Sequence, residues 1–207
     1  MTINDNRQMR SAAITQPAIR DRILAEAERL FRAYGYSKTT VADVAQACEM
    51  SPANVYRFFE SKAAMNEAIT EVVLARMEAM SQGIAREARP ASERLKRLVM
   101  EGHRFTCEQY LNESRVHEIV AKAMDEQWSV IDAHIERVRA CYRLVIEDGA
   151  RSGEFSADKL EDRCQCVFNA VIPFCHPQIV AERYSLDRGR QAALMAEFLV
   201  DSLLVRS

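Results

Sequence analysis

The chain has 207 residues, of which 48% are hydrophobic and 28% are charged, and it contains only six glycines and five prolines. This composition is typical of a globular protein with a sizeable core, and the scarcity of glycine and proline favours long helices over a turn-rich β-fold. The amino terminus is polar and no uninterrupted apolar run approaches about 18 residues, so we expect neither a signal peptide nor a membrane-spanning segment.

The distribution of charge is more informative than its total. The net charge of −2 does not by itself indicate a nucleic-acid-binding protein. Residues 1–62, however, hold nine Lys or Arg against seven Asp or Glu, whereas the remainder holds nineteen against twenty-three. The slight basic excess therefore lies in the N-terminal part. Six cysteines without a signal sequence indicate reduced thiols and a cytoplasmic protein.

The first predicted helix covers residues 18–34. Residues 1–17 before it are polar and lack an apolar period, so we expect a flexible tail there, with a minor-groove arm as the alternative. Gly35 is a typical helix stop. The helix is predicted from an apolar stripe at helical spacing, which consists of Ile19, Ile23, Leu24, Ala27, Leu30 and Phe31.

Residues 37–62 have the pattern of two short helices joined by a tight turn, followed by the start of a third helix. Thr40 precedes the first, and Asp43 three residues later gives the spacing of a capping box. Ser51 as N-cap, with Pro52 at the first helical position, marks the second start. This is the arrangement of a helix-turn-helix, whose second helix lies in the major groove of DNA.

The residues left outside by this pattern suit contact with DNA. Asn54 can bind an adenine edge, Arg57 can contact guanine or phosphate, and the small Ala53 lets the helix approach the bases. Hydroxyl and ammonium groups nearby can bind phosphate oxygens. The predicted DNA-binding residues are Thr40, Ser51, Ala53, Asn54, Tyr56, Arg57 and Lys62.

The rest of the chain keeps a helical period, so the sequence predicts an all-α protein. Pro90 is expected to end the helix that starts at Ser61, and Pro173 and Pro177 are expected to break or kink the penultimate helix near its end. The predicted helices after the helix-turn-helix cover residues 61–89, 91–110, 114–124, 126–152, 157–174 and 187–205.

The four histidines and six cysteines form no recognisable catalytic or metal-binding pattern. His103 and Cys107 lie on one helical face, but two ligands do not make a site, and no CxxC or HExxH spacing occurs. No nucleophile–base arrangement or Gly-rich phosphate loop is identifiable, so we predict no enzymatic activity, no metal and no cofactor. A thiol switch is an alternative that requires an exposed thiol of low pKa at Cys107, Cys141, Cys164, Cys166 or Cys175.

Residues 19–74 resemble the DNA-binding region of the TetR family of bacterial transcriptional regulators. Glu49 departs from the pattern, because the family usually carries glycine in this turn, and a left-handed glutamate costs about 1–2 kcal/mol. The matching positions are the apolar first helix, Gly35-Tyr36, Thr39-Thr40-Val41, Asp43-Val44-Ala45, Ser51, Val55-Tyr56, Phe59 and Ser61-Lys62.

The resemblance implies a helix-turn-helix domain at residues 18–64 and a larger effector-binding and dimerisation domain at 65–207. It implies a homodimeric repressor that a small apolar or amphipathic effector releases from a pseudo-palindromic double-stranded DNA operator. It also implies an effector pocket among aromatic and sulfur-bearing side chains, although these could fill an ordinary core. The candidate pocket residues are Met100, His103, Phe105, Cys107, Tyr110, Met124, Trp128, Tyr142, Phe168 and Phe174.

The resemblance further implies that the last two helices form a four-helix bundle with those of a second subunit. The alternative is that their apolar faces close the core of the monomer itself. Two rival functions stay open: a helical interaction module with a vestigial helix-turn-helix, and a small-molecule enzyme. The candidate dimer residues are Leu160, Cys164, Val167, Val171, Ala192, Ala193, Ala196, Leu199, Val200 and Leu203.

Overall fold

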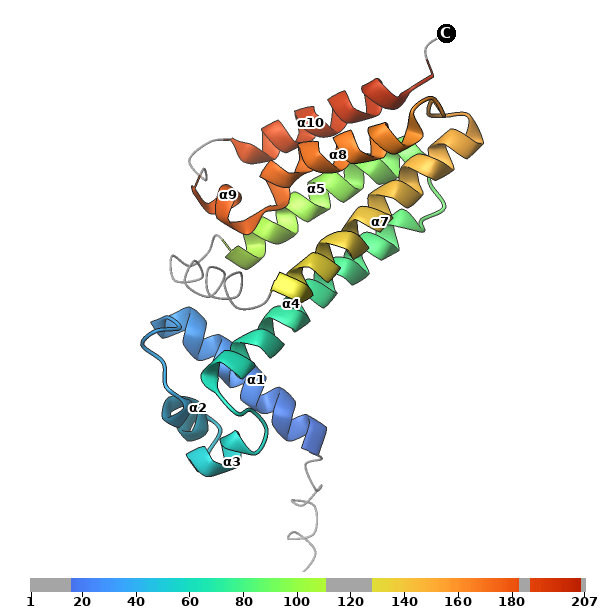
Figure 1. The fold of residues 1–207 in the computed structure, drawn as a ribbon. Helices are drawn as coiled ribbons and strands as arrows, with labels where there is room; N and C mark the ends of the chain where they lie inside the picture. The colour runs from blue at the N-terminus through green and yellow to red at the C-terminus, as the bar shows by residue number, and fades with distance from the viewer. Residues whose placement is uncertain (1–15, 111–127, 183–186, 206–207) are drawn as a thin grey trace, which may run out of the picture. The chain divides into compact units, whose positions relative to one another are not determined.

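The computed structural model of the chain describes residues 16–110, 128–182 and 187–205. Apart from a single bridge between Phe155 and Leu204, all regular structure in these residues is helical, which confirms the predicted all-α fold. The helices in Figure 1 are α1 (Gln16–Tyr34), α2 (Val41–Ala47), α3 (Pro52–Tyr56), α4 (Lys62–Ala85), α5 (Ala91–Tyr110), α7 (Trp128–Ser152), α8 (Leu160–Cys175), α9 (Pro177–Glu182) and α10 (Arg188–Leu203).

The chain divides into two compact units between Ile69 and Thr70. Helix α4 contributes residues to both units. The domain boundary that the sequence predicts, between residues 64 and 65, stays a prediction. Helix α1 begins two residues before its predicted start, while residues 1–15 of the predicted tail and the predicted helix at 114–124 lie outside the described residues.

The first unit is built around the apolar stripe of α1. Gly35 ends this helix with φ of 94°, a backbone conformation that glycine adopts without strain. The Phe31 and Tyr36 rings then pack edge to face, with centroids 5.2 Å apart. The buried side chains of this core are Ile23, Leu24, Ala27, Leu30, Phe31, Val44, Ala45, Val55, Phe59 and Met65.

The end of α4 was predicted wrongly. The helix ends at Ala85 and not at Pro90. The Arg94 guanidinium donates to the Ala85 carbonyl oxygen at 2.6 Å and to the Asp148 carboxylate at 2.9 Å, which satisfies the end of α4 from outside the helix. Pro90 instead lies directly before α5, where its carbonyl accepts from the Arg94 N–H at 3.1 Å.

The end of the chain also differs from the prediction. Helix α8 begins at Leu160, three residues later than expected, because Lys159 adopts a left-handed conformation with φ of 49°. It runs past Pro173 to Cys175, since a missing N–H near a helix end removes only one hydrogen bond. Pro177 then begins the short helix α9, which the sequence pattern did not reveal.

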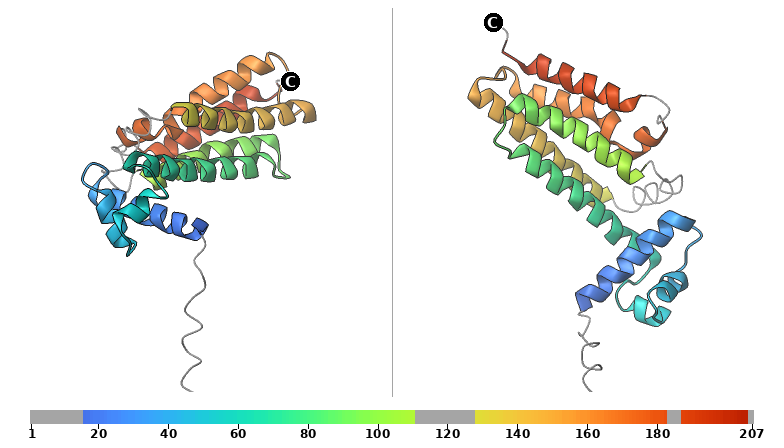
Figure 2. Two further views of the ribbon diagram at one scale, coloured as in Figure 1. Left: turned by 60° about the horizontal axis from the view of Figure 1, so that its bottom comes forward. Right: turned by 180° about the vertical axis from the view of Figure 1, so that it is seen from behind.

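Helices α5, α7, α8 and α10, with the C-terminal part of α4, enclose the core of the second unit (Figures 1 and 2). Phe155 closes one end of this core: its ring lies so close to Gly149 that a Cβ there would come within 2.2 Å of it. The Ser156 N–H donates to the Leu203 carbonyl at 2.8 Å, which holds the end of α10 in place. The fully buried side chains of this core include Leu95, Leu98, Val99, Val145, Ile146, Phe155 and Leu203.

Glu154 caps the start of α5. Its two carboxylate oxygens accept from the backbone N–H groups of Ala91 at 2.7 Å and Ser92 at 3.0 Å. Burial alone would raise the pKa of this carboxyl, but the hydrogen bonds and the charge of Arg94 outweigh it and lower the pKa.

We expect Glu154→Gln to destabilise the protein by about 1 kcal/mol, as the loss of a helix cap does. Because the pKa of Glu154 is lower in the folded state, its carboxylate stabilises the protein fully above the ordinary Glu pKa of 4.5. This stabilisation is lost as the pH falls through the pKa of Glu154 in the folded protein. Urea unfolding at pH 7 and at pH 3 measures this. A difference between variant and parent that does not shrink at pH 3 contradicts the assignment, and the exposed Glu93→Gln serves as control.

Candidate nucleic-acid interface

The start of α2 has the predicted capping box. The Asp43 N–H donates to Thr40 Oγ1 at 3.2 Å, and the Thr40 N–H donates to Asp43 Oδ2 at 2.8 Å. The Thr40 hydroxyl also donates to Asp43 Oδ2 at 2.7 Å. These bonds from the side chain and backbone of Thr40 lower the pKa of the Asp43 carboxyl. The direction in which α2 enters the unit is therefore fixed by residues adjacent in sequence.

The turn after α2 has the geometry that a glycine usually supplies. Glu49 has φ of 55°, so the expected left-handed residue is present at this position. The Glu49 N–H donates to the Gln46 carbonyl at 3.0 Å, and the Met50 N–H donates to the Ala45 carbonyl at 2.9 Å. These two bonds form a Schellman motif. The turn is thus regular despite the glutamate.

Helix α3 follows at once and presents the predicted face. The Asn54 N–H donates to Ser51 Oγ at 3.3 Å, which confirms Ser51 as N-cap. Val55 is fully buried, whereas the Tyr56 side chain is 52% exposed. Ser51, Ala53 and Arg57 are exposed as well, and Asn54 is half-buried. Among the described residues the Arg57 side chain makes no hydrogen bond or ion pair, so its guanidinium is available to a partner.

Lys62 differs from the other predicted DNA-binding residues. Its ammonium donates to the backbone carbonyls of Tyr36 at 2.8 Å and Thr39 at 3.1 Å. It also lies 4.2 Å from the centre of the Tyr36 ring, a cation–π distance. The side chain therefore joins the segment before α2 to the start of α4. Its predicted role at phosphate stays a prediction.

We expect Lys62→Met to destabilise the protein by about 1–3 kcal/mol, because hydrogen bonds to a charged group are lost and two carbonyls lose their donor. Thermal unfolding without DNA measures this loss, and the exposed Lys38→Met is the matched control. If Lys62→Met unfolds like the parent protein, the carbonyl contacts do not stabilise the unit, and the phosphate contact is left as its role.

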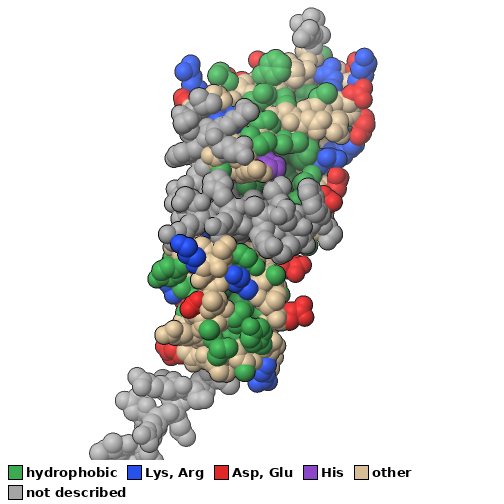
Figure 3. All heavy atoms as spheres, turned by 60° about the vertical axis from the view of Figure 1, so that its left-hand side comes forward, with side chains coloured by type: hydrophobic (Ala, Val, Ile, Leu, Met, Phe, Trp, Pro, Cys, Tyr) green, Lys and Arg blue, Asp and Glu red, His purple; other side chains and the backbone are tan. Residues whose placement is uncertain are grey.

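The surface of the first unit carries charges of both signs. On the face drawn in Figure 3, Lys and Arg side chains are interspersed with Asp and Glu and with hydrophobic groups. This agrees with the slight basic excess of residues 1–62. The predicted contact of Arg57 with phosphate therefore does not rest on a large basic patch, and it stays a prediction.

The predicted effector-pocket residues fall into separate groups. Tyr142 and Phe168 pack edge to face, 5.9 Å apart, within the main core of the second unit. His103 and Phe174 form a second contact, with ring centroids 6.3 Å apart and His103 Nδ1 2.9 Å from the Phe174 carbonyl oxygen. Met100, Phe105 and Cys107 are half-buried. Met124 lies outside the described residues, and the side chains of Tyr110 and Trp128, at the ends of their helices, are not described.

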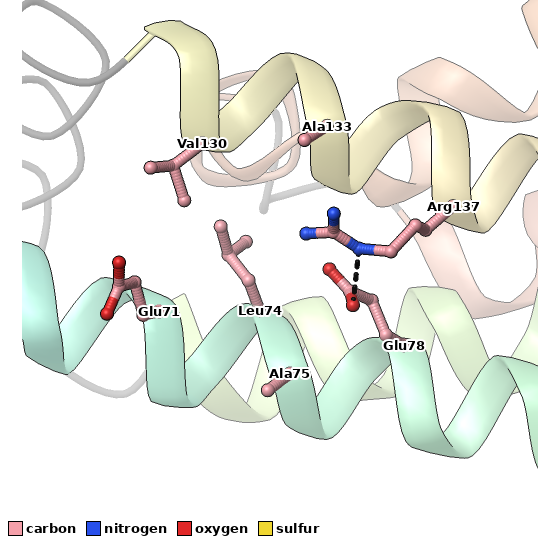
Figure 4. A pocket seen from close by; sticks show the side chains of 7 residues that line it. All are labelled: Glu71, Leu74, Ala75, Glu78, Val130, Ala133 and Arg137. Carbon is pink, nitrogen blue, oxygen red and sulfur yellow. Dashed lines mark hydrogen bonds and ion pairs between the residues drawn. The ribbon is translucent and has the colours of Figure 1, made fainter.

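A hollow of about 380 Å³ lies between α4 and α7, and it involves none of the predicted pocket residues. Figure 4 shows side chains of the two helices facing each other across it, with Glu78 of α4 bound to Arg137 of α7. The lining residues are Glu71, Leu74, Ala75, Glu78, Val130, Ala133 and Arg137.

Glu78 connects α4 to α7 at two points. One carboxylate oxygen accepts from Arg137 Nε at 2.7 Å, and the other lies 2.8 Å from His134 Nδ1. Burial would raise the pKa of Glu78, but the bonds from Arg137 and His134 lower it. Burial lowers the pKa of His134 more than Glu78 raises it, so the histidine is neutral at physiological pH. The charged pair is therefore Glu78–Arg137.

Most of the predicted dimer residues are buried within the subunit, and their role in a dimer stays a prediction. Leu160 and Ala193 are half-buried, and Cys164, Val167, Val171, Ala192, Ala196, Leu199, Val200 and Leu203 are buried. The small side chains of α10 permit close packing on α5 and α8 within one subunit. The large apolar side chains exposed on α10 are instead Leu194, at 55%, and Phe198, at 66%. They are four residues apart and share one face.

The cysteines are free thiols, and most are shielded. Burial raises the pKa of Cys107, Cys141 and Cys164, and raises that of Cys175 to about 12. These four thiols lack the low pKa that a redox switch requires. Cys166 is exposed. Among the described residues no group of three His, Cys, Asp or Glu could hold a metal ion, and no helix is both long and apolar enough to cross a membrane.

Comparison with known proteins gives two family matches. The family described as "Bacterial regulatory proteins, tetR family" matches residues 23–69. The family described as "Tetracyclin repressor-like, C-terminal domain" matches residues 91–194, half of the chain. The HTH-type transcriptional regulator TcmR of Streptomyces glaucescens is 40% identical over 76 residues, 36% of this chain. The match spans 30% of the length of TcmR.

Solved structures share the fold at low sequence identity. A regulator of the TetR/AcrR family from Thermobifida fusca superposes with a TM-score of 0.68 at 19% identity, over 88% of this chain and 96% of its own. SmeT, the repressor of the Stenotrophomonas maltophilia multidrug efflux pump SmeDEF, superposes with a TM-score of 0.66 at 14% identity, over 91% of each chain. SmeT has also been solved in complex with triclosan.

Sequence patterns missed the polar residues that join different helices. Glu78 and His134 are 56 positions apart, and no local spacing relates them. Arg188 was not singled out either, although it is buried at the start of α10, beside the predicted pocket residue Phe174. Arg188 lies on the same helical face as the apolar residues Ala192 and Ala196, and a charged residue at such a position is the sequence signal that could have revealed it.

Proposed function

The chain belongs to the TetR family of bacterial transcriptional regulators, and from this we propose that it is a repressor that binds a pseudo-palindromic DNA operator as a homodimer. The observation that supports this most directly is the exposed face of α3. A Schellman turn precedes it, Val55 and Phe59 anchor it, and Arg57 and Tyr56 point away from the core. A recognition helix requires this combination of a buried inner face and a polar outer face.

We propose that Leu194 and Phe198 of α10 form the centre of the dimer interface. Large exposed apolar side chains on one helical face are typical of interface cores, and aromatic anchors contribute most to their affinity. A two-fold axis between two subunits would then place their recognition helices in successive major grooves, about 34 Å apart.

We propose that a small apolar or amphipathic effector binds the second unit and lowers the affinity for DNA. Helix α4 contributes residues to both units, and the pair Glu78–Arg137 attaches it to α7. A ligand that favours a different arrangement of α4 and α7 would change the position of the DNA-binding unit, and a coupling of about 1–3 kcal/mol is usual for such switches. The complex of SmeT with triclosan is an example of a small aromatic ligand in a protein of this fold.

Selection of DNA sites from a random duplex library tests the proposed function. We expect the selected operator to be a pseudo-palindrome whose half-sites are centred about 10 base pairs, or a multiple of that, apart. If no sequence is enriched over successive rounds, the protein is not a sequence-specific regulator. The alternative, a helical interaction module with a vestigial helix-turn-helix, would then be favoured. Insertion of the operator before a reporter gene then distinguishes repression from activation.

A further inference from the structure

Arg188 is a buried cation that pairs with no carboxylate among the residues that the structure describes. It is the first residue of α10, and only 8% of its surface is exposed. Its Nη1 donates to the Gln191 side-chain oxygen at 3.4 Å, a long hydrogen bond. Its Nε and Nη2 are buried and have no hydrogen-bond partner in the described parts of the chain. Among the described residues no carboxylate pairs with this guanidinium.

A buried charge without a counter-ion is unfavourable. A bound ligand of opposite charge would remove this cost. The ring of Phe174 lies 5.8 Å from the guanidinium carbon and offers a cation–π contact. A cation–π contact uses the face of the guanidinium, so the N–H groups at its edge stay unsatisfied. Nε and Nη2 share that edge, which is the pair of donors that binds a carboxylate in bidentate fashion.

Neutral groups of α5 and α8 lie near Arg188, and the carboxylate of Glu108 acts on the same Cys107 thiol as Arg188 does. The carbonyl of Phe174 lies 2.9 Å from Nδ1 of His103, and Nε2 of that histidine lies 3.6 Å from the thiol of Cys107. The charge of Arg188 acts on the Cys107 thiol as well. Three residues that the sequence predicts for an effector pocket, His103 and Cys107 of α5 and Phe174 of α8, therefore lie in the neighbourhood of Arg188. The N-terminus of α10, a helix of 16 residues, adds its positive dipole.

We propose that Arg188 binds the anionic head group of the effector, which is a small molecule with an apolar body and a single carboxylate or similar oxyanion. This inference rests on the proposed function, since it names the chemical class of the effector for the same protein. A planar oxyanion satisfies both free N–H groups, and the apolar body of the ligand packs against the aromatic and sulfur-bearing side chains beside them.

Two fluorescent probes that differ only in charge test the proposal with the full-length protein. 8-Anilinonaphthalene-1-sulfonate carries an anionic head, and N-phenyl-1-naphthylamine is the same aromatic skeleton without it. We expect the protein to bind the sulfonate at least about 10-fold more tightly, as a bidentate charged contact allows. Arg188→Gln is expected to remove this preference and to leave the affinity for the uncharged probe unchanged.

The control variant is Arg190→Gln, which removes an exposed arginine from the same first turn and should leave both affinities unchanged. Arg188→Gln is also expected to melt no lower than the parent, because it removes an unpaired buried charge. A clear fall in melting temperature would instead assign Arg188 a structural role and overturn the proposal. The proposal is also overturned if the parent binds the two probes equally or binds neither saturably. An unchanged preference for the sulfonate in Arg188→Gln would overturn it as well.

Operator affinity separates this inference from the proposed function. Without probe, Arg188→Gln and the parent should bind the selected operator equally. If both bind the operator but neither prefers the sulfonate, only the assignment of the effector class fails. If neither binds any operator while the parent still prefers the sulfonate, the regulator function fails and the anion site stands.

Discussion

Phe198→Glu is expected to convert the dimer into monomers and to reduce operator affinity by about 10²–10⁴-fold, because two half-sites then have to be bound independently. The Phe198 side chain is 66% exposed in the subunit, so its replacement leaves the core of the monomer intact. In the proposed interface the same position would bury a glutamate carboxylate without a partner, which is strongly unfavourable. Analytical ultracentrifugation and anisotropy with the selected operator measure the two effects.

Lys96→Glu is the matched control for this variant, because it places a glutamate at an exposed position of another helix, α5. It should remain dimeric and should bind the operator as the parent does. Circular dichroism should show the same helix content for both variants. A dimeric Phe198→Glu with the affinity of the parent would show that subunits associate through another surface.

Arg57→Ala has the second largest expected effect, a loss of about 1–3 kcal/mol of operator affinity, or roughly 5- to 150-fold. The guanidinium is exposed at the end of α3 and makes no hydrogen bond or ion pair among the described residues, so the variant leaves no partner unsatisfied within the subunit. If Arg57 contacts a base, the loss is confined to the operator and specificity relaxes at one position. If it contacts phosphate, affinity for a scrambled duplex falls equally.

Asn54→Ala extends the same test to the half-buried neighbour of Arg57. Arg29→Ala, on the exposed surface of α1, removes an arginine of equal charge outside α3 and is the matched control. An unchanged operator affinity in both Arg57→Ala and Asn54→Ala would mean that α3 does not read DNA, whatever its geometry.

Local patterns in the sequence were sufficient for the helix-turn-helix. The bonds of Thr40 with Asp43, and of Ser51 with Asn54, join residues three apart, so spacing alone reveals them. The left-handed Glu49 could be expected because the turn requires such a residue at that position. The predicted start and end of α5, at Ala91 and Tyr110, also agree with the structure.

Contacts between distant residues could not be predicted in the same way. Helix α4 ends early because Arg94 caps Ala85, a bond that local helix signals do not encode. On α10 the sequence shows two apolar faces, one with Ala192 and Ala196 and one with Leu194 and Phe198. Only packing on neighbouring helices decides that the first lies inside the monomer. The unpaired edge of Arg188 is likewise visible only once its surroundings are known.

The most direct test of the central claim is the fluorescence anisotropy of the selected operator and of a scrambled duplex, titrated with the full-length protein at two salt concentrations. We expect the operator to bind at least about 10³-fold more tightly than the scrambled duplex at physiological salt, with both affinities falling steeply as salt increases. Equal and weak binding of the two duplexes would contradict the account, since a recognition helix that does not distinguish its operator does not make this protein a regulator.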